Sequence, residues 1–478
     1  MSPTGPWPDW VKDAVFYQVF PDRFARSDRV HKPNGLEAWD APPTLHGYKG
    51  GDLLGVVERL DHLQALGVTA LYLCPVFASG ANHRYHTHDY HVVDPMLGGD
   101  AALVELLEAC HARGMKVVLD GVFNHASRGL LQFHDLLENG PASPYRDWFH
   151  VHRFPLNAYG GGSLGYEAWW GLAALPKFNT SNPDVREFIY QVAERWLGVG
   201  TDGWRLDVPN EIDDDEFWRE FRRRCRAVNP DAYLVGEIWD DAGRWLQGDI
   251  FDGVMNYQLN RAILGLVGRQ LAHDELSRSG LNGIERLDAA GFAGVGAKLL
   301  QAYPDEAVHC QLNLLGSHDT PRLATTLMGD GAAVRQAYLL LFTWPGAPCV
   351  YYGDEIGLTG GHDPGCRGAM PWDHEDAWDR DLMGYLSALA AARARLAALR
   401  RGRTRLLAPA DGVVVVERCL PHEPPTLAVV NLTDAPAAVP TDAVPAGDYR
   451  DEVSGATLRQ AEGAPLVPAR GGLLLTRA

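Results

Sequence analysis

The chain has 478 residues, 46% hydrophobic and 22% charged, a composition typical of a globular protein with ample core. Its formal net charge of -18 repels nucleic acid and anionic lipid, and no basic run or RNA-type aromatic motif argues otherwise. This length predicts about two or three domains.

The cysteines and the N-terminus indicate a reducing compartment. The seven cysteines are scattered and form no CxxC pair, which argues against both a disulfide framework and a zinc site. Residues 1–7 (MSPTGPW) lack the basic and apolar regions of a signal peptide, and no apolar run is long enough to span a membrane. We therefore expect a cytoplasmic protein that contacts neither membrane nor nucleic acid.

Strand and helix patterns alternate along most of the chain. A strand is predicted within residues 13–20, a helix within 53–66 that stops at Gly67, and a second strand at 68–75. A helix at 101–113 and a strand at 115–124 repeat the pattern, and five further strands are predicted at 202–207, 233–237, 253–257, 312–318 and 347–352. Eight such units predict an α/β fold, a (β/α)8 TIM barrel with a parallel sheet.

Two segments depart from this alternation. Residues 125–182 show little periodicity and are too long for an ordinary connection, so we predict an excursion subdomain B after the third strand. From about residue 403 the apolar period is two, with strands at 413–417, 426–432 and 472–475, which predicts a C-terminal β-sandwich. The expected domains are a catalytic barrel of residues 1–124 and 183–402, subdomain B of 125–182, and the β-sandwich of 403–478.

Acidic side chains stand at the ends of two successive apolar strands. Arg205 and Asp207 share one face of an extended strand, and the guanidinium is expected to keep the carboxylate ionised. Glu237 ends the next apolar run, where apolar neighbours are expected to separate its pKa from that of Asp207. Such a pair suits a nucleophile and a proton donor. On spacing alone an alternative stays open, a rim ion pair between Arg205 and Asp207 with Glu237 as a helix cap.

Four predicted strand ends carry polar or charged side chains. Taken together and in this order, they resemble those of the α-amylase superfamily of glycoside hydrolases, and the resemblance covers nearly the whole chain. They are residues 120–125 (DGVFNH), Arg205 with Asp207, Glu237, and residues 317–319 (SHD). Supporting stretches are residues 50–52 (GGD), 175–179 (LPKFN) and 351–357 (YYGDEIG). Residues 208–211 (VPNE), the LPKFN stretch and residues 363–367 (DPGCR) are most similar to the neopullulanase, cyclomaltodextrinase and maltogenic amylase branch.

The resemblance implies roles for the matching residues. Asp207 matches the nucleophile, Glu237 the acid/base, and Asp319 the third carboxylate, which binds sugar hydroxyls. Matches to residues that contact the sugar are Tyr85, His125, Arg205, His318, Asp363 and Arg367. The histidine-rich loop around Tyr85, including His83, is expected to bind sugar rather than metal.

Three further residues are candidates for substrate binding with open alternatives. Trp239 is a candidate aromatic platform for an acceptor sugar. Glu211 matches a position near the acceptor subsites, although it also suits the start of a helix. Asp120 is interpreted as an orienting residue, with direct substrate contact as the alternative.

These matches imply a retaining α-glucan hydrolase. The expected substrates are cyclodextrins, starch and maltooligosaccharides, cleaved at α-1,4 bonds mainly to maltose, with transglycosylation as a side reaction. A retaining mechanism needs two carboxyls about 5 Å apart and an acid of raised pKa. The alternatives are an α-glucosidase or glucanotransferase and a catalytically silent sugar-binding protein, which the presence of all three carboxylates disfavours.

Two departures from the branch pattern affect assembly and metal binding. Relatives usually carry an N-terminal β-domain, whereas the barrel pattern begins near residue 14 here, so a monomer or a homodimer of another kind is expected. Relatives also often bind calcium, an ion that takes six to eight oxygens, in the loop after the first strand. Asp28, Gly50 and Asp52 match that loop, but Arg26, His31 and Lys32 stand where ligands are expected. We expect no cofactor requirement and no calcium in this loop, although Asn124 offers a ligand for another site.

Overall fold

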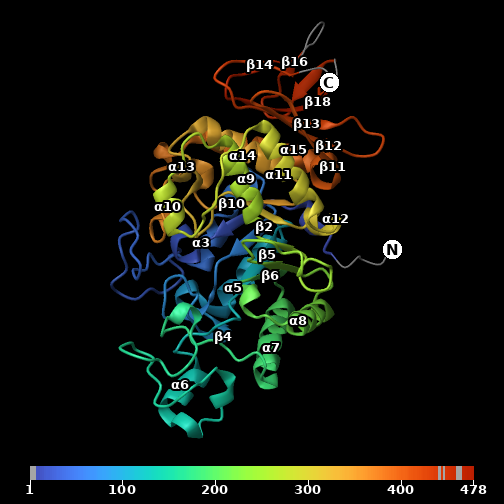
Figure 1. Ribbon diagram of the computed structural model, residues 1–478. Coiled ribbons are helices and arrows are strands. Elements are labelled where there is room, and N and C mark those ends of the chain that lie inside the picture. The colour runs from blue at the N-terminus through green and yellow to red at the C-terminus, as the bar shows by residue number, and fades with distance from the viewer. Residues whose placement is uncertain (1–6, 440–442, 445–446, 459–465) are drawn as a thin grey trace.

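A closed parallel barrel lies at the centre of the computed structural model, which describes residues 7–439, 443–444, 447–458 and 466–478 (Figure 1). Its eight strands run in the order β8-β7-β6-β5-β2-β1-β10-β9, and a parallel bridge between Met255 and Leu312 joins the two outer strands. The strands are β1 (Phe16–Val19), β2 (Ala70–Leu73), β5 (Lys116–Gly121), β6 (Gly203–Leu206), β7 (Tyr233–Gly236), β8 (Gly253–Val254), β9 (Leu312–Leu314) and β10 (Ala347–Tyr351). The predicted (β/α)8 fold is confirmed.

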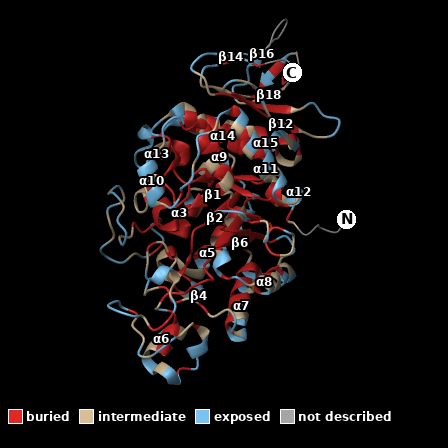
Figure 2. Cartoon of the chain, viewed as in Figure 1, coloured by how far each residue is buried: buried red, intermediate tan, exposed pale blue. Residues whose placement is uncertain are grey.

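The barrel strands are apolar because both of their faces are covered. Every residue of β1, β2, β6 and β7 is buried, as expected for parallel strands enclosed by helices (Figure 2). Gln18 and Arg205 are polar exceptions within these strands. Both point into the network of side chains at the carboxyl ends of the strands, described below.

Helices surround the barrel and bury one face each. The longer ones are α5 (Gly99–His111), α7 (Pro183–Val199), α8 (Asp215–Val228), α9 (Tyr257–Val267), α11 (Ala289–Gln301), α14 (Gly331–Thr343) and α15 (Arg380–Arg395). The shorter ones are α1 (Trp10–Asp13), α2 (Pro21–Phe24), α10 (His273–Arg278), α12 (Asp305–His309), α13 (Leu323–Thr326) and α16 (Ala397–Arg401). In the described ranges no helix has the length and apolar content needed to cross a membrane.

The single helix predicted within residues 53–66 is wrong in one respect, since it is divided into α3 (Leu53–Glu58) and α4 (Leu60–Leu66). Arg59 leaves the helical conformation with φ -111° and ψ 8°. Its guanidinium lies 4.3 Å from the ring centroid of Trp372, a tertiary contact that periodicity does not reveal. Gly67 ends α4 in the left-handed region at φ 87°, as predicted.

A hairpin that the sequence patterns did not reveal follows β2. It consists of β3 (Phe77–Ser79) and β4 (Thr87–Val93), and its register shifts twice, which breaks the alternation that marks a strand. The connection between the two strands carries His83 and Tyr85 toward the active face of the barrel.

The chain between β5 and α7 forms a compact aromatic unit around α6 (Leu131–Asn139), at the end of the molecule opposite the C-terminal strands (Figure 1). Phe133 and Phe149 pack edge to face, and Phe149 stacks on Phe178 with ring centroids 5.5 Å apart. An antiparallel bridge between His125 and Lys177 joins the two ends of the segment at the rim of the barrel.

The chain after residue 403 is antiparallel β-structure, as predicted. A six-stranded sheet consists of β11 (Arg403–Ala410), β12 (Val413–Cys419), β13 (Thr426–Asn431), β18 (Gly472–Arg477), β15 (Tyr449–Asp451) and β16 (Thr457–Leu458). A second sheet pairs β14 (Ala437–Ala438) with β17 (Leu466–Val467). Along β12, Val414 and Val416 join the barrel core, whereas Val413 and Val415 pack in a separate C-terminal core. The period of two thus reflects two apolar environments on opposite faces of one strand.

Candidate active site

The guanidinium of Arg205 connects three carboxyl groups at the carboxyl ends of β5, β6 and β7. Its Nη1 donates to Asp120 Oδ1 (2.9 Å) and to Asp207 Oδ1 (3.0 Å), and its Nη2 lies 2.9 Å from Glu237 Oε2. The register of the barrel strands brings Arg205 next to Asp120, because the two residues are paired across β5 and β6. Asp207 and Glu237 follow their strands directly and continue the ladder, with backbone N–H groups donating to Gly121 and Leu206.

Burial raises the pKa of both Asp207 and Glu237. Arg205 opposes the shift but does not outweigh burial, and each carboxylate is further disfavoured by its acidic neighbours. Arg205 favours the ionised form of Asp207, as expected, whereas burial and the neighbouring acids act against it. One cation faces three buried carboxyls, so the cluster retains a proton at a pH where isolated carboxyls are ionised.

Residue Val208, directly after Asp207, has a left-handed backbone with φ 36° and ψ 50°. A β-branched residue adopts this conformation only at a free-energy cost, which is typical of functional sites. The turn directs the Val208 N–H at Glu237 Oε2, at 3.2 Å. The backbone strain therefore brings the ends of β6 and β7 together around the two carboxyls.

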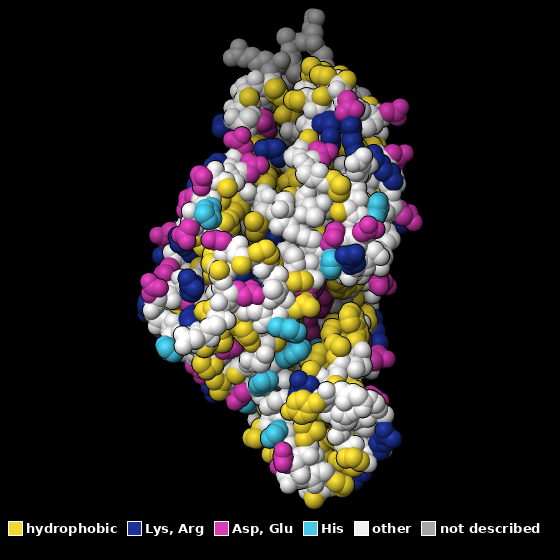
Figure 3. Space-filling view, turned by 90° about the vertical axis from the view of Figure 1, so that its left-hand side faces the viewer, with side chains coloured by type: hydrophobic (Ala, Val, Ile, Leu, Met, Phe, Trp, Pro, Cys, Tyr) yellow, Lys and Arg dark blue, Asp and Glu magenta, His cyan; other side chains and the backbone are white. Residues whose placement is uncertain are grey.

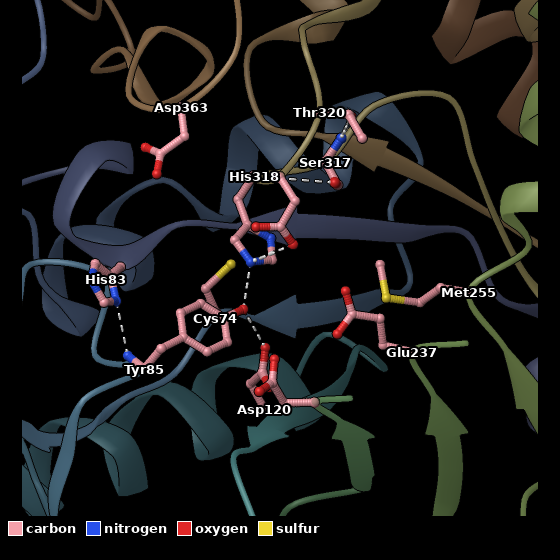
Figure 4. Close-up of polar contacts among 12 residues, drawn as sticks. Cys74, His83, Tyr85, Asp120, Glu237, Met255, Ser317, His318, Thr320 and Asp363 are labelled. Atoms are coloured by element: carbon pink, nitrogen blue, oxygen red, sulfur yellow. Dashed lines mark hydrogen bonds and ion pairs between the residues drawn. The ribbon is translucent and has the colours of Figure 1, made fainter. Parts of the chain in front are cut away.

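A hydrogen-bonded chain links His318 to the same cluster (Figure 4). The amide nitrogen of Gln18 can only donate, and it lies 2.7 Å from His318 Nδ1, so the ring proton is on Nε2. Nε2 lies 2.5 Å from the hydroxyl of Tyr85, which donates to Asp120 Oδ2 at 2.8 Å. Burial keeps His318 neutral by lowering its pKa well below the usual range. The ring planes of Tyr85 and His318 are stacked at 5°.

Asp319 lies at the other side of this histidine, in reach of two cationic or N–H donors. His318 Nε2 is 3.1 Å from Asp319 Oδ2, and Arg367 Nη2 is 3.4 Å from Asp319 Oδ1. Arg367 also pairs with Asp363 at 3.1 Å. With 31% of its side chain accessible, Asp319 is more exposed than Asp207 or Glu237, and it faces the open cavity.

A cavity of about 980 Å³ opens above the carboxyl cluster. Figure 3 shows a hollow in the face of the molecule between the barrel and the α6 unit. The predicted site residues that line the cavity are His83, Tyr85, His125, Asp207, Glu211, Glu237, Trp239, His318, Asp319, Asp363 and Arg367. The tertiary structure thus brings together residues that lie far apart in the chain.

Asp120 and Arg205 do not line this cavity, although Arg205 was expected to contact the sugar and Asp120 was a candidate for such a contact. They are 1% and 0% exposed and lie beneath its floor. The oxygens of Asp120 accept hydrogen bonds from Tyr72, Tyr85 and Arg205, which leaves no route to a sugar. The expected contact of Arg205 with the sugar is therefore corrected to a positioning role, whereas the placement of Asp120 agrees with its interpretation as an orienting residue.

Aromatic rings line the cavity with the carboxyl pair. Trp239 stacks on Tyr257 with centroids 3.9 Å apart and donates its N–H to Glu237 Oε1 at 3.0 Å. Trp169 stacks on His125 with centroids 5.0 Å apart. Flat apolar faces beside many hydrogen-bonding groups suit the faces and hydroxyls of neutral sugars.

Histidine side chains at the floor stay neutral and offer N–H donors. Burial lowers the pKa of His125 to about 3, and it lowers that of His83 well below the usual range. His125 Nδ1 lies 3.3 Å from the donating amide of Asn124, so its Nε2 carries the proton. That buried N–H has no hydrogen-bond partner within the part of the chain that the structure describes. The ring of His125 nevertheless lines the cavity.

Comparison with known proteins decides the family. Residues 18–387 match the model of the alpha amylase catalytic domain. The chain belongs to the α-amylase family. This result confirms the predicted resemblance.

Relatives within the α-amylase family support the predicted branch. A cyclomaltodextrinase from Bacillus sp is 45% identical over 402 residues, which cover 84% of this chain and 69% of that protein. Neopullulanase 2 from Thermoactinomyces vulgaris is 44% identical over 401 residues, 83% of this chain and 65% of that protein. The chain thus spans about two thirds of the length of these curated relatives.

Solved structures match the whole fold. Ttha1563 from Thermus thermophilus superposes with a TM-score of 0.93 and 48% identity, covering 98% of this chain and 100% of that one. Cyclic alpha-maltosyl-(1→6)-maltose hydrolase from Arthrobacter globiformis has a TM-score of 0.88 and 39% identity over 99% of this chain and 100% of its own. That hydrolase has also been solved with its cyclic sugar and with maltose.

The loop that holds calcium in many α-amylase family proteins does not fit the ion here. The ammonium of Lys32 lies 3.0 Å from Asp52 Oδ2, with side chains 10% and 0% exposed. The oxygens of Asp52 also accept hydrogen bonds from the backbone N–H groups of Ser27 and Gly55. Asp52 therefore already has a protein cation and two N–H donors as partners, an arrangement that does not fit a calcium ligand. In the described ranges, no group of at least three His, Cys, Asp or Glu side chains is arranged to hold a metal.

Several residues of the site were not predicted from the sequence. Gln18 and Tyr72 orient His318 and Asp120, and a polar side chain within an otherwise buried strand was the available signal. Trp169 and Trp170 lie in the aperiodic segment, where no local pattern separates a cavity wall from a core.

Proposed function

We propose that the protein is a retaining α-glucan hydrolase with Asp207 as nucleophile, Glu237 as acid/base and Asp319 as the third carboxylate. The observation that carries this proposal is the shared guanidinium, since contacts of about 3 Å to both Asp207 and Glu237 hold the two carboxyls on one side of a sugar-sized cavity. Retaining glycosidases need two carboxyls about 5 Å apart.

The reaction divides into two displacements. Asp207 attacks the anomeric carbon while Glu237 transfers its proton to the glycosidic oxygen, so the leaving sugar departs and a glycosyl ester forms on Asp207. Glu237 then takes a proton from water, the water oxygen attacks the anomeric carbon, and the carboxylate of Asp207 is released. Two inversions retain the α configuration. The raised pKa of Glu237 suits its first role.

The substrates we propose are cyclodextrins, starch and maltooligosaccharides, cleaved at α-1,4 bonds mainly to maltose. The names of the relatives, cyclomaltodextrinase and neopullulanase, support this class. Trp239, beside the acid, offers a platform for an acceptor sugar, which supports transglycosylation as a side reaction. An α-glucosidase or glucanotransferase is the alternative on the same machinery.

A second candidate has a specific observation in its favour. The chain matches the full length of a hydrolase of cyclic alpha-maltosyl-(1→6)-maltose, whereas it spans about two thirds of the cyclomaltodextrinase. The second candidate function is therefore hydrolysis of a cyclic substrate that contains α-1,6 bonds, in preference to cyclodextrins and starch. Chromatography of the products from β-cyclodextrin, soluble starch, pullulan, maltotriose and this cyclic tetrasaccharide separates these candidates.

Single substitutions test the roles of the carboxyls. We expect Asp207→Ala and Glu237→Gln each to lower kcat by about three orders of magnitude or more, because each removes a step of the double displacement. With an activated α-fluoride substrate, azide is expected to give the retained α-glycosyl azide in a Glu237→Ala variant and the inverted β-glycosyl azide in Asp207→Ala, because only the first variant still forms the glycosyl ester. Hydrolysis that survives Asp207→Ala at the wild-type rate contradicts the proposal.

We also propose a compartment, a cofactor requirement and an oligomeric state. All seven cysteines lie in described residues and are unpaired, and six of them are buried, which supports a reducing compartment such as the cytoplasm. We propose that no cofactor takes part and that the protein acts as a monomer or homodimer. Size-exclusion chromatography with light scattering distinguishes these two states.

A further inference from the structure

Trp170 presents an indole to solvent from a strained backbone. The residue is 80% exposed, and its φ of 51° and ψ of 23° are left-handed. Such a conformation costs free energy in any residue with a Cβ, and exposure of a large apolar ring adds to the cost. Core packing explains neither feature, because the ring is outside the core.

The ring continues a stack that begins inside the active cavity. His125, 1% exposed, stacks on Trp169 with centroids 5.0 Å apart and planes 16° apart. Trp169 in turn stacks on Trp170 at 4.5 Å and 14°. All three residues line the same cavity. The result is a set of parallel aromatic faces leading from the floor of the cavity to the surface.

The lining of this cavity suits a neutral carbohydrate. Glu211, Asn210 and Leu172 are among its lining residues, and Glu211 is paired with Lys177 at 3.2 Å, so its charge is compensated. Trp239 also lines the cavity, and it contacts the acid Glu237 directly. Trp239 is therefore near the cleaved bond, whereas Trp170 is two rings removed from the cavity floor.

We infer that Trp170 forms an outer subsite, where it stacks on a glucosyl unit remote from the cleaved bond in a long or cyclic α-glucan. This inference rests on the proposed function and specifies its substrate class. The outer subsite makes chain length a determinant of specificity, since a short oligosaccharide bound at the carboxyls does not reach it. Continuity with the catalytic cavity favours a glucan chain over a protein partner.

A Trp170→Ala variant tests the inference, with maltotriose and maltoheptaose as substrates. We expect kcat/KM for maltoheptaose to fall about tenfold and that for maltotriose to stay within about twofold. Trp170→Phe, which retains a ring, is expected to recover most of the loss. The matched control is Tyr159→Ala, because Tyr159 is 77% exposed in the same segment but does not line the cavity.

Binding is measured separately from turnover. Maltoheptaose is titrated into wild-type and Trp170→Ala proteins, each carrying Glu237→Gln, by isothermal calorimetry. A loss of affinity for maltoheptaose of about tenfold, absent for maltotriose, supports the outer subsite. Equal losses for both sugars, or no loss for either, overturn it. If wild-type protein cleaves neither sugar, the proposed function fails while the calorimetry still decides the role of Trp170.

Discussion

A single buried cation sets the chemistry of the site at the scale of residues. Arg205 contacts Asp120, Asp207 and Glu237, so its one charge cannot balance three carboxylates. Burial raises the pKa of each of these acids, and Arg205 lowers it. The retained proton is what a general acid needs, and the ionised partner is what a nucleophile needs. Asp120 contributes through this balance without touching the substrate.

An Asp120→Asn substitution is expected to move the acidic limb of the kcat/KM profile to lower pH. The charge of Asp120 raises the pKa of Asp207, so its removal lowers that pKa and keeps the nucleophile ionised in more acidic solution. The profile is measured on maltoheptaose. Tyr72→Phe is the control, because it removes a hydrogen bond to Asp120 at 2.7 Å and leaves the charge in place. Movement of the limb to higher pH contradicts this account.

At the scale of elements, one carboxylate joins helix α10 to the loop that carries His362. Glu275, on α10, accepts hydrogen bonds at Oε2 from His362 Nδ1 (2.6 Å) and from the His362 backbone N–H (2.7 Å). These hydrogen bonds lower the pKa of Glu275. A Cβ at Gly361 would lie 2.3 Å from Glu275 Oε2, so a larger residue there would displace the carboxylate from this position. The same loop carries Asp363 and Arg367, the second of which holds Asp319.

A Glu275→Ala variant is expected to raise KM about three- to tenfold with a smaller change in kcat, because the loop loses its anchor while the carboxyl cluster stays intact. Steady-state kinetics on maltoheptaose measures both constants. Asp274→Ala removes an adjacent, exposed charge from the same helix and is expected to leave KM unchanged. A fall in kcat with constant KM would show that Glu275 acts on chemistry rather than on loop position.

At the scale of the whole molecule, the barrel and the C-terminal sheet share apolar core. Val414 and Val416 of β12 pack in the barrel cluster, and Arg418, fully buried, donates to the carbonyl oxygens of Thr343 and Gly402. The two parts are therefore expected to unfold together. At the other side of the barrel, Lys32 supplies an internal cation to Asp52.

Chelation and a substitution of Lys32 together test whether the fold depends on a bound metal or on this internal cation. Excess EDTA is expected to leave both the melting temperature and the activity unchanged, because the ammonium of Lys32 already compensates Asp52. Lys32→Ala is expected to destabilise the protein by about 3 kcal/mol, since it leaves a buried carboxylate uncompensated. Differential scanning calorimetry measures both. A melting temperature that falls on chelation indicates a bound metal and contradicts this prediction.

The sequence by itself determined the architecture and the order of the acidic strand ends. Apolar runs such as β6 and β7, each ending in a carboxylate, are local patterns, and local patterns fix periodicity and strand direction. Only the tertiary structure decided which side chains line the cavity. Gln18 contacts His318, which lies 300 positions away in the chain, and burial raises the pKa of Asp207 although Arg205 lowers it. Desolvation and long-range contacts depend on what packs against a residue, and no local pattern carries that information.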